Sequence, residues 1–393
     1  MHDLSKTYPA LPRTVWALGL VSLLMDMSSE IIHGLLPLFL TTTLGASVAL
    51  VGVIDGVAEA TAAIAKVFSG YVSDRMGRRK PLILLGYGMA ALTKPLFPLA
   101  ASAGLVFGAR FLDRIGKGLR GAPRDALIAD VTPDYQRGRA YGLRQTLDTI
   151  GAFIGPLIAI GLMQLYANDM RMVFWFAAIP ALLSVSLVLF GVQDAPAAPR
   201  TASAKVPIHW RDLRDLDAAY WRVVALGVVF TLARFSEAFL ILKAHNGGLA
   251  LALAPLVLVA MNVVYALGAY PAGVLADRMG PRGLLLASLV ALITADVLLA
   301  LGDGLTMIFA GIALWGVHMA LSQGLLSKLV ADHAPAALRG SAFGVFNLSS
   351  GIALLLASAL AGLLWTLFGA ATTFWAGAVF ALLAGMLVSA MRE

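Results

Sequence analysis

The chain has 393 residues, of which 60% are hydrophobic and only 13% are charged, and its mean hydropathy is +0.85. Soluble domains are about 45–50% apolar and about 25% charged, so this composition excludes an ordinary soluble protein. The net charge of +7 is spread over short loops between apolar runs, unlike the clustered basic surface of a nucleic-acid-binding protein, and the lack of cysteine excludes disulfides and thiolate metal sites.

From the N-terminus onward, the apolar residues form runs near the roughly 20 residues that a helix needs to cross the hydrocarbon layer. The first run is longer than the apolar part of a signal peptide and has no small-residue cleavage pattern, so we expect it to be retained. The sequence predicts an all-α membrane protein with twelve transmembrane helices, at 14–42, 48–72, 81–101, 104–129, 139–165, 172–193, 221–244, 249–276, 283–302, 305–331, 341–367 and 371–391.

The basic residues of the loops predict the orientation, because Lys and Arg are retained on the cytoplasmic side during insertion. With the N-terminus inside, the loops on that side hold almost all the basic loop residues, and the opposite loops hold only Arg171. We therefore expect a multi-pass protein of the bacterial inner (plasma) membrane with both termini in the cytoplasm.

One long polar stretch, residues 194–220, separates the sixth span from the seventh. Its first part contains Pro196, Pro199 and small residues, which is typical of a linker. Its second part has apolar residues at helical spacing, from Trp210 to Tyr220, and predicts an amphipathic helix on the inner membrane surface.

Two segments of the first half recur in the second half. Residues 70–80 read GYVSDRMGRRK and 273–283 read GVLADRMGPRG, while 125–143 read DALIADVTPDYQRGRAYGL and 327–345 read SKLVADHAPAALRGSAFGV. Two matches at nearly one offset indicate a duplication, and an even number of spans inserts both copies the same way round. We expect two pseudo-symmetric six-helix bundles, 1–193 and 221–393, joined by the linker.

The loop between spans two and three carries the resemblance to a known family. Its residues match the signature G-x-x-x-D-R-x-G-R-[RK] and are partly repeated in the second half: Gly70, Asp74, Arg75, Gly77 and Arg78, then Gly273, Asp277 and Arg278. On this basis the chain resembles the major facilitator superfamily of transporters. The resemblance implies that these residues latch the cytoplasmic side shut in one access state, or that they only set the topology.

Two further motifs resemble those of the proton-driven drug and solute antiporter branch of this family. In span four, Arg114 stands where the family has an arginine associated with proton coupling, although Lys117 and Arg120 depart from the pattern. In span five, Gly151, Gly155 and Pro156 resemble an antiporter motif. Small residues and a proline in one span are equally typical of close helix packing with a bend.

Ionisable residues inside the spans indicate function, because each is costly there unless it is paired or faces water. Spacing places the acidic and basic groups of the first half on single helix faces: Asp26, Glu30 and His33; Asp55 and Glu59; Arg110, Arg114 and Lys117. Depth estimates predict one layer of Glu30, Asp55 and Arg114 and another of Asp26, Glu59 and Lys117.

Each layer would hold two carboxylates and one base, so one carboxylate could carry a proton at neutral pH. Our hypothesis is that Asp26 or Glu30 couples protons and that Arg114 displaces the proton, with Asp55 and Glu59 in the same network. The alternative is a fixed salt-bridge network. Some other charges lie nearer helix ends and are expected to snorkel or to face loops, namely Lys66, Lys94, Arg120, Arg124 and Asp125, while Arg144 and Asp148 are expected to pair.

Candidate substrate contacts come from both halves: His33, Arg110, Lys117, Arg234, Glu237 and Trp315. One histidine beside carboxylates is a weak metal-ligand set, so no metal site and no cofactor are expected.

The sequence favours proton-coupled export of a small organic compound by a monomeric secondary transporter in the lipid bilayer. The basic residues of span four leave open the transport of an organic anion or a metal chelate, by uptake or export. A non-transporting receptor remains an alternative. An intramembrane enzyme is disfavoured, because the chain has no H-E-x-x-H, G-x-S-x-G or G-x-x-x-x-G-K-[ST] motif.

Overall fold

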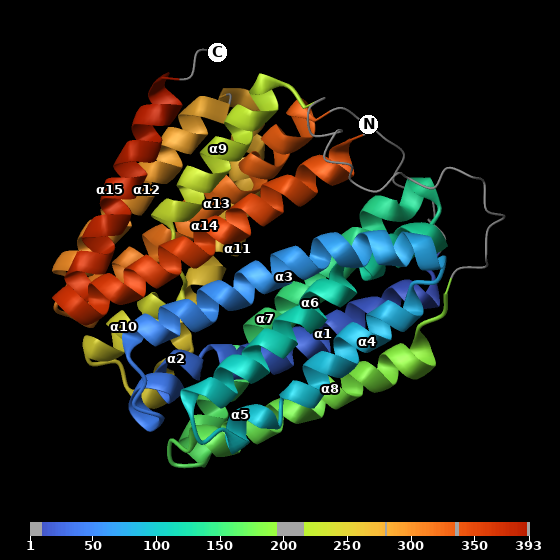
Figure 1. Cartoon of the computed structure of the whole chain (residues 1–393), viewed down its shortest axis with the longest axis horizontal. Helices are drawn as coiled ribbons and strands as arrows, with labels where there is room; N and C mark the ends of the chain where they lie inside the picture. Colours follow the sequence, from blue (N-terminus) through green and yellow to red (C-terminus); the bar gives the residue numbers. More distant parts are fainter. Residues whose placement is uncertain (1–9, 195–215, 280, 335–337, 391–393) are drawn as a thin grey trace.

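The computed structural model describes residues 10–194, 216–279, 281–334 and 338–390, and this part of the chain is helical without strands (Figure 1). In chain order the helices are α1 (Arg13–His33), α2 (Leu36–Leu38), η1 (Phe39–Thr43), α3 (Val48–Met76), α4 (Lys80–Thr93), α5 (Leu96–Leu99), α6 (Ala103–Val131), η2 (Asp134–Gln136), α7 (Arg137–Leu165), α8 (Met170–Gly191), α9 (Ala218–Ala233), α10 (Ala238–Asn246), η4 (Leu251–Leu253), α11 (Leu256–Met279), α12 (Pro281–Leu301), α13 (Leu305–His333), α14 (Arg339–Phe368) and α15 (Ala370–Ala390).

Within the described residues, 11 helical segments are long and apolar enough to cross a membrane. Helix α6 is not among them because of its charges, yet its 29 residues match the length of the neighbouring α3, and it packs against both α3 and α4. It is therefore the twelfth span, as the sequence predicts. Several spans are interrupted, for example at Pro95, which lacks the N–H that would continue α4.

The helices form two groups (Figure 1). Helices α1 to α8 pack among themselves, through the pairs α1 with α7 and α8 and α6 with α3 and α4, and helices α9 to α15 do the same through α12 with α13 and α15 and α11 with α13. The groups meet mainly where α3 lies along α14, and also where α7 meets α11.

Helices α3 and α14 run in opposite directions and touch over only part of their lengths. Near the start of α3, Ala49 N–H donates to Thr366 Oγ1 at 3.0 Å, and further along, an added Cβ on Gly351 would lie 2.9 Å from Ala63. We call the side where α3 begins and α14 ends the far side, and the opposite side the near side. The two groups thus contact each other on the far side and separate towards the near side.

The seventh span begins before its predicted start. Tyr220, which the sequence assigned to the polar stretch, belongs to α9 and is completely buried, with its hydroxyl donating to Ala342 O. Residues 195–215, with most of the expected amphipathic helix, lie outside the described residues.

Candidate functional site

Helix α6 carries its charges into the interior of the first group. Arg110, Asp113 and Arg114 are 2%, 3% and 5% exposed, and each has an oppositely charged partner on a neighbouring helix. Arg110 Nη2 lies 3.4 Å from Asp55 Oδ1, Arg114 Nη1 lies 3.1 Å from Glu59 Oε1, and Asp113 Oδ1 lies 3.0 Å from Lys94 Nζ. Pairing offsets part of the cost of burying these charges.

These pairs correct the predicted layers, in which Arg114 stood level with Asp55. Helices α3 and α6 are parallel, and α3 ends at Met76 instead of 72. Counted from the observed ends, Asp55 and Arg110 lie at one depth and Glu59 and Arg114 at another. The error came from the predicted end of the second span.

The structure also corrects the predicted position of Lys94. It was expected to snorkel from a helix end, but it is 2% exposed and donates to Asp113 Oδ1 and to Ser29 Oγ. The third span continues through α5 beyond Pro95, so Lys94 lies inside it.

Among the described residues Asp26 has no basic partner within ion-pair distance, and its carboxyl group lies within hydrogen-bonding reach of that of Asp148 on α7. A hydrogen bond between two carboxyl groups requires a proton on one of them. The basic side chains within electrostatic reach of Asp26 include Lys117 and Arg120.

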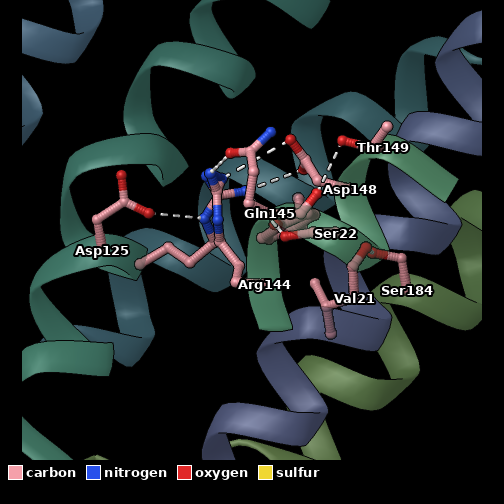
Figure 2. Close-up of polar contacts among 10 residues, drawn as sticks. Val21, Ser22, Asp125, Arg144, Gln145, Asp148, Thr149 and Ser184 are labelled. Carbon is pink, nitrogen blue, oxygen red and sulfur yellow. Dashed lines mark hydrogen bonds and ion pairs between the residues drawn. The ribbon is translucent and has the colours of Figure 1, made fainter. Parts of the chain in front are cut away.

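Asp148 also belongs to a polar cluster between α1, α6 and α7 (Figure 2). Its carboxylate lies 3.8 Å from Arg144 Nη1, which confirms the expected pair, and 3.9 Å from Arg124 Nη1. Arg124 also donates to Ser22 Oγ and contacts Asp125. The guanidinium groups of Arg124 and Arg144 therefore lie close to the Asp148 member of the Asp26–Asp148 pair.

Glu30 and His33 form a local pair, with Nδ1 of His33 3.5 Å from Oε2 of Glu30. In the part of the chain that the structure describes, no group of three or more His, Cys, Asp or Glu side chains is placed to hold a metal ion. Glu237, at the start of α10, faces His33, Arg234 and Glu30 without a close ion pair among the described residues.

A hydrogen-bonded chain links the two groups beside Arg110. Ser236, in the break between α9 and α10, donates through its hydroxyl to Asp55 Oδ2 at 2.7 Å. Its N–H donates to Ser358 Oγ of α14 at 3.1 Å. Asp55 therefore bonds to Arg110 in its own group and to Ser236 in the other.

Between the groups lies a cavity of about 260 Å³, on the near side of this link. From α3 and α6 it is lined by Glu59, Lys66 and Lys117, and from the second group by Thr231, Arg234, Asn347 and Ser350. Residues of both halves thus face one space large enough for a small organic compound.

Of the six expected substrate contacts, Lys117 and Arg234 line this cavity, and the other four do not: His33, Arg110, Glu237 and Trp315. Trp315 is fully buried against Phe235, and its indole Nε1 has no partner among the described residues. Arg110 faces Asp55 instead.

The loop after α3 has the turn that its glycine predicts. Gly77 ends α3 with a φ of 66°, a left-handed conformation that glycine adopts without strain. Arg75 donates to Tyr71 Oη, and Arg78 is exposed. The side chains of Asp74, Asp277 and Arg278 lie outside the described residues. An added Cβ on Gly70 would make ordinary contact with Ala122, and one on Gly273 would meet nothing within 4 Å.

The glycines of α7 lie where this helix crosses α1. An added Cβ on Gly151 would come within 2.3 Å of Leu23 O, and one on Gly155 within 2.7 Å of Met27 O. Pro156 is buried in the same helix.

Sequence reasoning missed three residues of the site. Asp148 was assigned only to its pair with Arg144, Lys66 was assigned to a helix end, and Ser236 has no motif around it. Asp148 could have been found from its position in mid-span, whereas Lys66 and Ser236 depend on how the two halves meet.

Comparison with known proteins gives one family. Residues 18–261 and 238–392 match the Major Facilitator Superfamily. Over 386 residues the chain is 29% identical to an uncharacterised MFS-type transporter, MJ1317, of Methanocaldococcus jannaschii, covering 96% of this chain and 94% of that protein. Over 197 residues, 49% of this chain and 47% of the relative, it is 32% identical to the multidrug resistance protein MdtH of Yersinia enterocolitica.

Among solved structures, the fold is similar to that of a mutant of the nucleoside transporter NupG, with a TM-score of 0.81. The match covers 97% of this chain and 100% of that chain at 16% identity, so it concerns the fold alone.

Proposed function

Because the chain belongs to the Major Facilitator Superfamily and is therefore a membrane transporter, not an enzyme, we propose that it exports a small organic compound in a proton-coupled cycle. The transporter works by alternating access, in which two halves rock around a central site. It lies in the inner membrane with both termini, and hence the near side, in the cytoplasm. The resemblance to a multidrug resistance protein supports export.

The observation that carries the proposal is the pair of carboxyl groups of Asp26 and Asp148. The pair lies inside the membrane-spanning helices α1 and α7, within hydrogen-bonding reach, where a bond between the two carboxyl groups requires a proton. A proton held by two carboxyls can leave when a cation approaches and return when the cation withdraws. The pair is therefore the proton-binding site of the cycle.

Lys117, and not Arg114, is the cation that controls this proton. Arg114 is held by Glu59 at 3.1 Å, so it is already neutralised. Lys117 lies within electrostatic reach of Asp26 and also lines the cavity, so it is placed to respond to a bound solute. The role that the sequence assigned to Arg114 thus passes to the residue one turn further along α6.

The separation of the halves supports alternating access. The Asp55–Ser236–Ser358 link and the α3–α14 contact close the far side, while the cavity lies towards the near side. The bond from Ser236 to Asp55 crosses between the groups, so it must break when the far side opens, whereas the bond from Ser236 to Ser358 stays within the second group.

Reconstitution in liposomes with a trapped pH-sensitive dye tests the function. Cationic drugs and organic acids are added to wild type, to Asp26→Asn and Asp148→Asn, and to Asp303→Asn, an exposed control in the loop before α13. We expect solute-dependent proton movement in wild type and the control and its loss in both carboxyl variants. Solute flux at the wild-type rate without proton movement would contradict the coupling.

A further inference from the structure

The charge of the cavity indicates the class of the substrate. Three basic side chains line it, Lys66, Lys117 and Arg234, against one carboxylate, Glu59. Glu59 already pairs with Arg114 at 3.1 Å, behind the cavity wall. The lining therefore has an excess of positive charge.

None of the three basic side chains has a hydrogen bond or an ion pair within 4 Å to another described residue. This differs from Arg110, Arg114 and Lys94 nearby, each of which has a carboxylate partner within that distance. Cations at membrane depth are paired or face water, so three unpaired ones around one space are expected to bind anions.

The three cations come from both halves. Lys66 and Lys117 belong to α3 and α6, whereas Arg234 stands directly after α9, where the seventh span is broken. Broken helices at the centre of the membrane are common sites of substrate binding in secondary transporters. Asn347 and Ser350 of α14 add neutral hydrogen-bonding groups to the same wall.

We propose that the transported compound is a small organic anion with two negative charges, such as a dicarboxylate, held between Lys66 and Lys117 on one side and Arg234 on the other. Repulsion among these cations opposes closure of the empty cavity, and the bound anion removes it. The halves can then close around the anion, which prevents cycling without a substrate.

Acidic groups also face this region, and they set the direction of the coupling. Asp26, Glu30 and Glu237 lie within electrostatic reach of Lys117 or Arg234. An anion bound to Lys117 weakens the electrostatic effect of Lys117 on the Asp26 carboxyl group. Proton binding and anion binding therefore favour each other, and the proton and the anion leave together. A dianion that leaves with one proton carries net negative charge outward, which an inside-negative membrane potential favours.

The inference rests on the proposed transport function, but binding tests it separately. Four single-ring probes are compared on the purified full-length protein: phthalate, benzoate, benzamide and benzyltrimethylammonium. Apparent affinity is taken from the rise in the thermal unfolding midpoint with probe concentration. We expect phthalate to bind about tenfold more tightly than benzamide, benzoate to lie between them, and the cation to bind no better than benzamide.

Variants locate the binding in the cavity. Lys66→Gln and Arg234→Gln each weaken phthalate binding about tenfold, and Arg234→Lys, which keeps the charge, restores most of it. Lys243→Gln, near the end of α10, and Arg222→Gln, near the start of α9, lie outside the cavity lining and leave binding unchanged. If Arg234→Gln does not fold, the Lys66 variant and the Arg234→Lys variant still decide the question.

The anion site is overturned if phthalate and benzamide bind equally tightly, or if the ammonium probe binds more tightly than phthalate. It is also overturned if neither anion binds at about 10 mM, or if the control variants lose as much affinity as the cavity variants. The same probes in dye-loaded liposomes separate the two proposals. Phthalate that binds without proton movement leaves the anion site standing and removes the coupling. Proton movement with the ammonium probe alone supports the coupling and overturns the anion site.

Discussion

At the scale of single residues, two classes of basic group inside the helices differ in their partners. Arg110, Arg114 and Lys94 each have a carboxylate within 3.4 Å and are held in place. Lys66, Lys117 and Arg234 line the cavity without such a partner. The first class stabilises the first half of the protein, and the second is available to a solute.

The Lys94–Asp113 pair tests whether the paired charges of the first class stabilise the protein. Lys94→Met alone leaves Asp113 buried without a partner and is expected to destabilise the protein by about 3–5 kcal/mol. Lys94→Met with Asp113→Leu removes both charges and recovers most of the loss. Thermal unfolding midpoints in detergent measure both effects, and a double variant as unstable as the single one would contradict a purely structural pair.

The sequence identified most of the ionisable groups at this scale but not all their partners. Asp26, Glu59 and Arg114 were placed correctly in the interior, because a charge in a span must face inward. Their pairing depends on helix ends, and a four-residue error at the end of α3 placed Arg114 level with Asp55 instead of with Glu59. Asp148 reaches Asp26 through the contact of α1 with α7, which no pattern in either helix predicts.

At the scale of helices, close packing of α1 and α7 brings the Asp26–Asp148 pair together. Gly151 and Gly155 allow it, because any side chain there would meet the backbone of α1. The motif that resembles an antiporter signature therefore has a direct packing explanation, and it acts on coupling through the distance between the two carboxyl groups.

Replacement of Gly151 tests the close packing of α1 against α7. In Gly151→Ala the new Cβ would lie 2.3 Å from Leu23 O, so α1 and α7 must separate, at a cost of about 1–3 kcal/mol of stability. Gly161→Ala on the same helix meets nothing within 4 Å and should be neutral or slightly stabilising. Unfolding midpoints compare the two, and equal values for both variants would exclude close packing at Gly151.

At the scale of the whole molecule, the sequence predicted the fold better than the site. Twelve spans and a duplicated six-helix unit follow from hydropathy and repeats, and even the charged α6 was recognised as a span. How the halves meet was not predicted, because the contact of Gly52 with Ser358 or the bond of Ser236 to Asp55 joins residues without any shared pattern.

The contact between the halves is also where the central claim, transport by alternating access, can be tested most directly. The chain has no cysteine, so the pair Ala49→Cys and Thr366→Cys introduces the only two thiols, at positions joined by a hydrogen bond across the far side. Oxidation should join the halves there. The single variants Ala49→Cys and Thr366→Cys, oxidised under the same conditions, serve as the controls, because neither can form the cross-link alone.

The measurement is solute flux in liposomes before oxidation, after oxidation and after reduction of the far-side pair. We expect that oxidation stops flux, that reduction restores it, and that the oxidised protein still binds solute from the near side. Unchanged flux through a protein shown to be fully cross-linked would contradict alternating access at this contact.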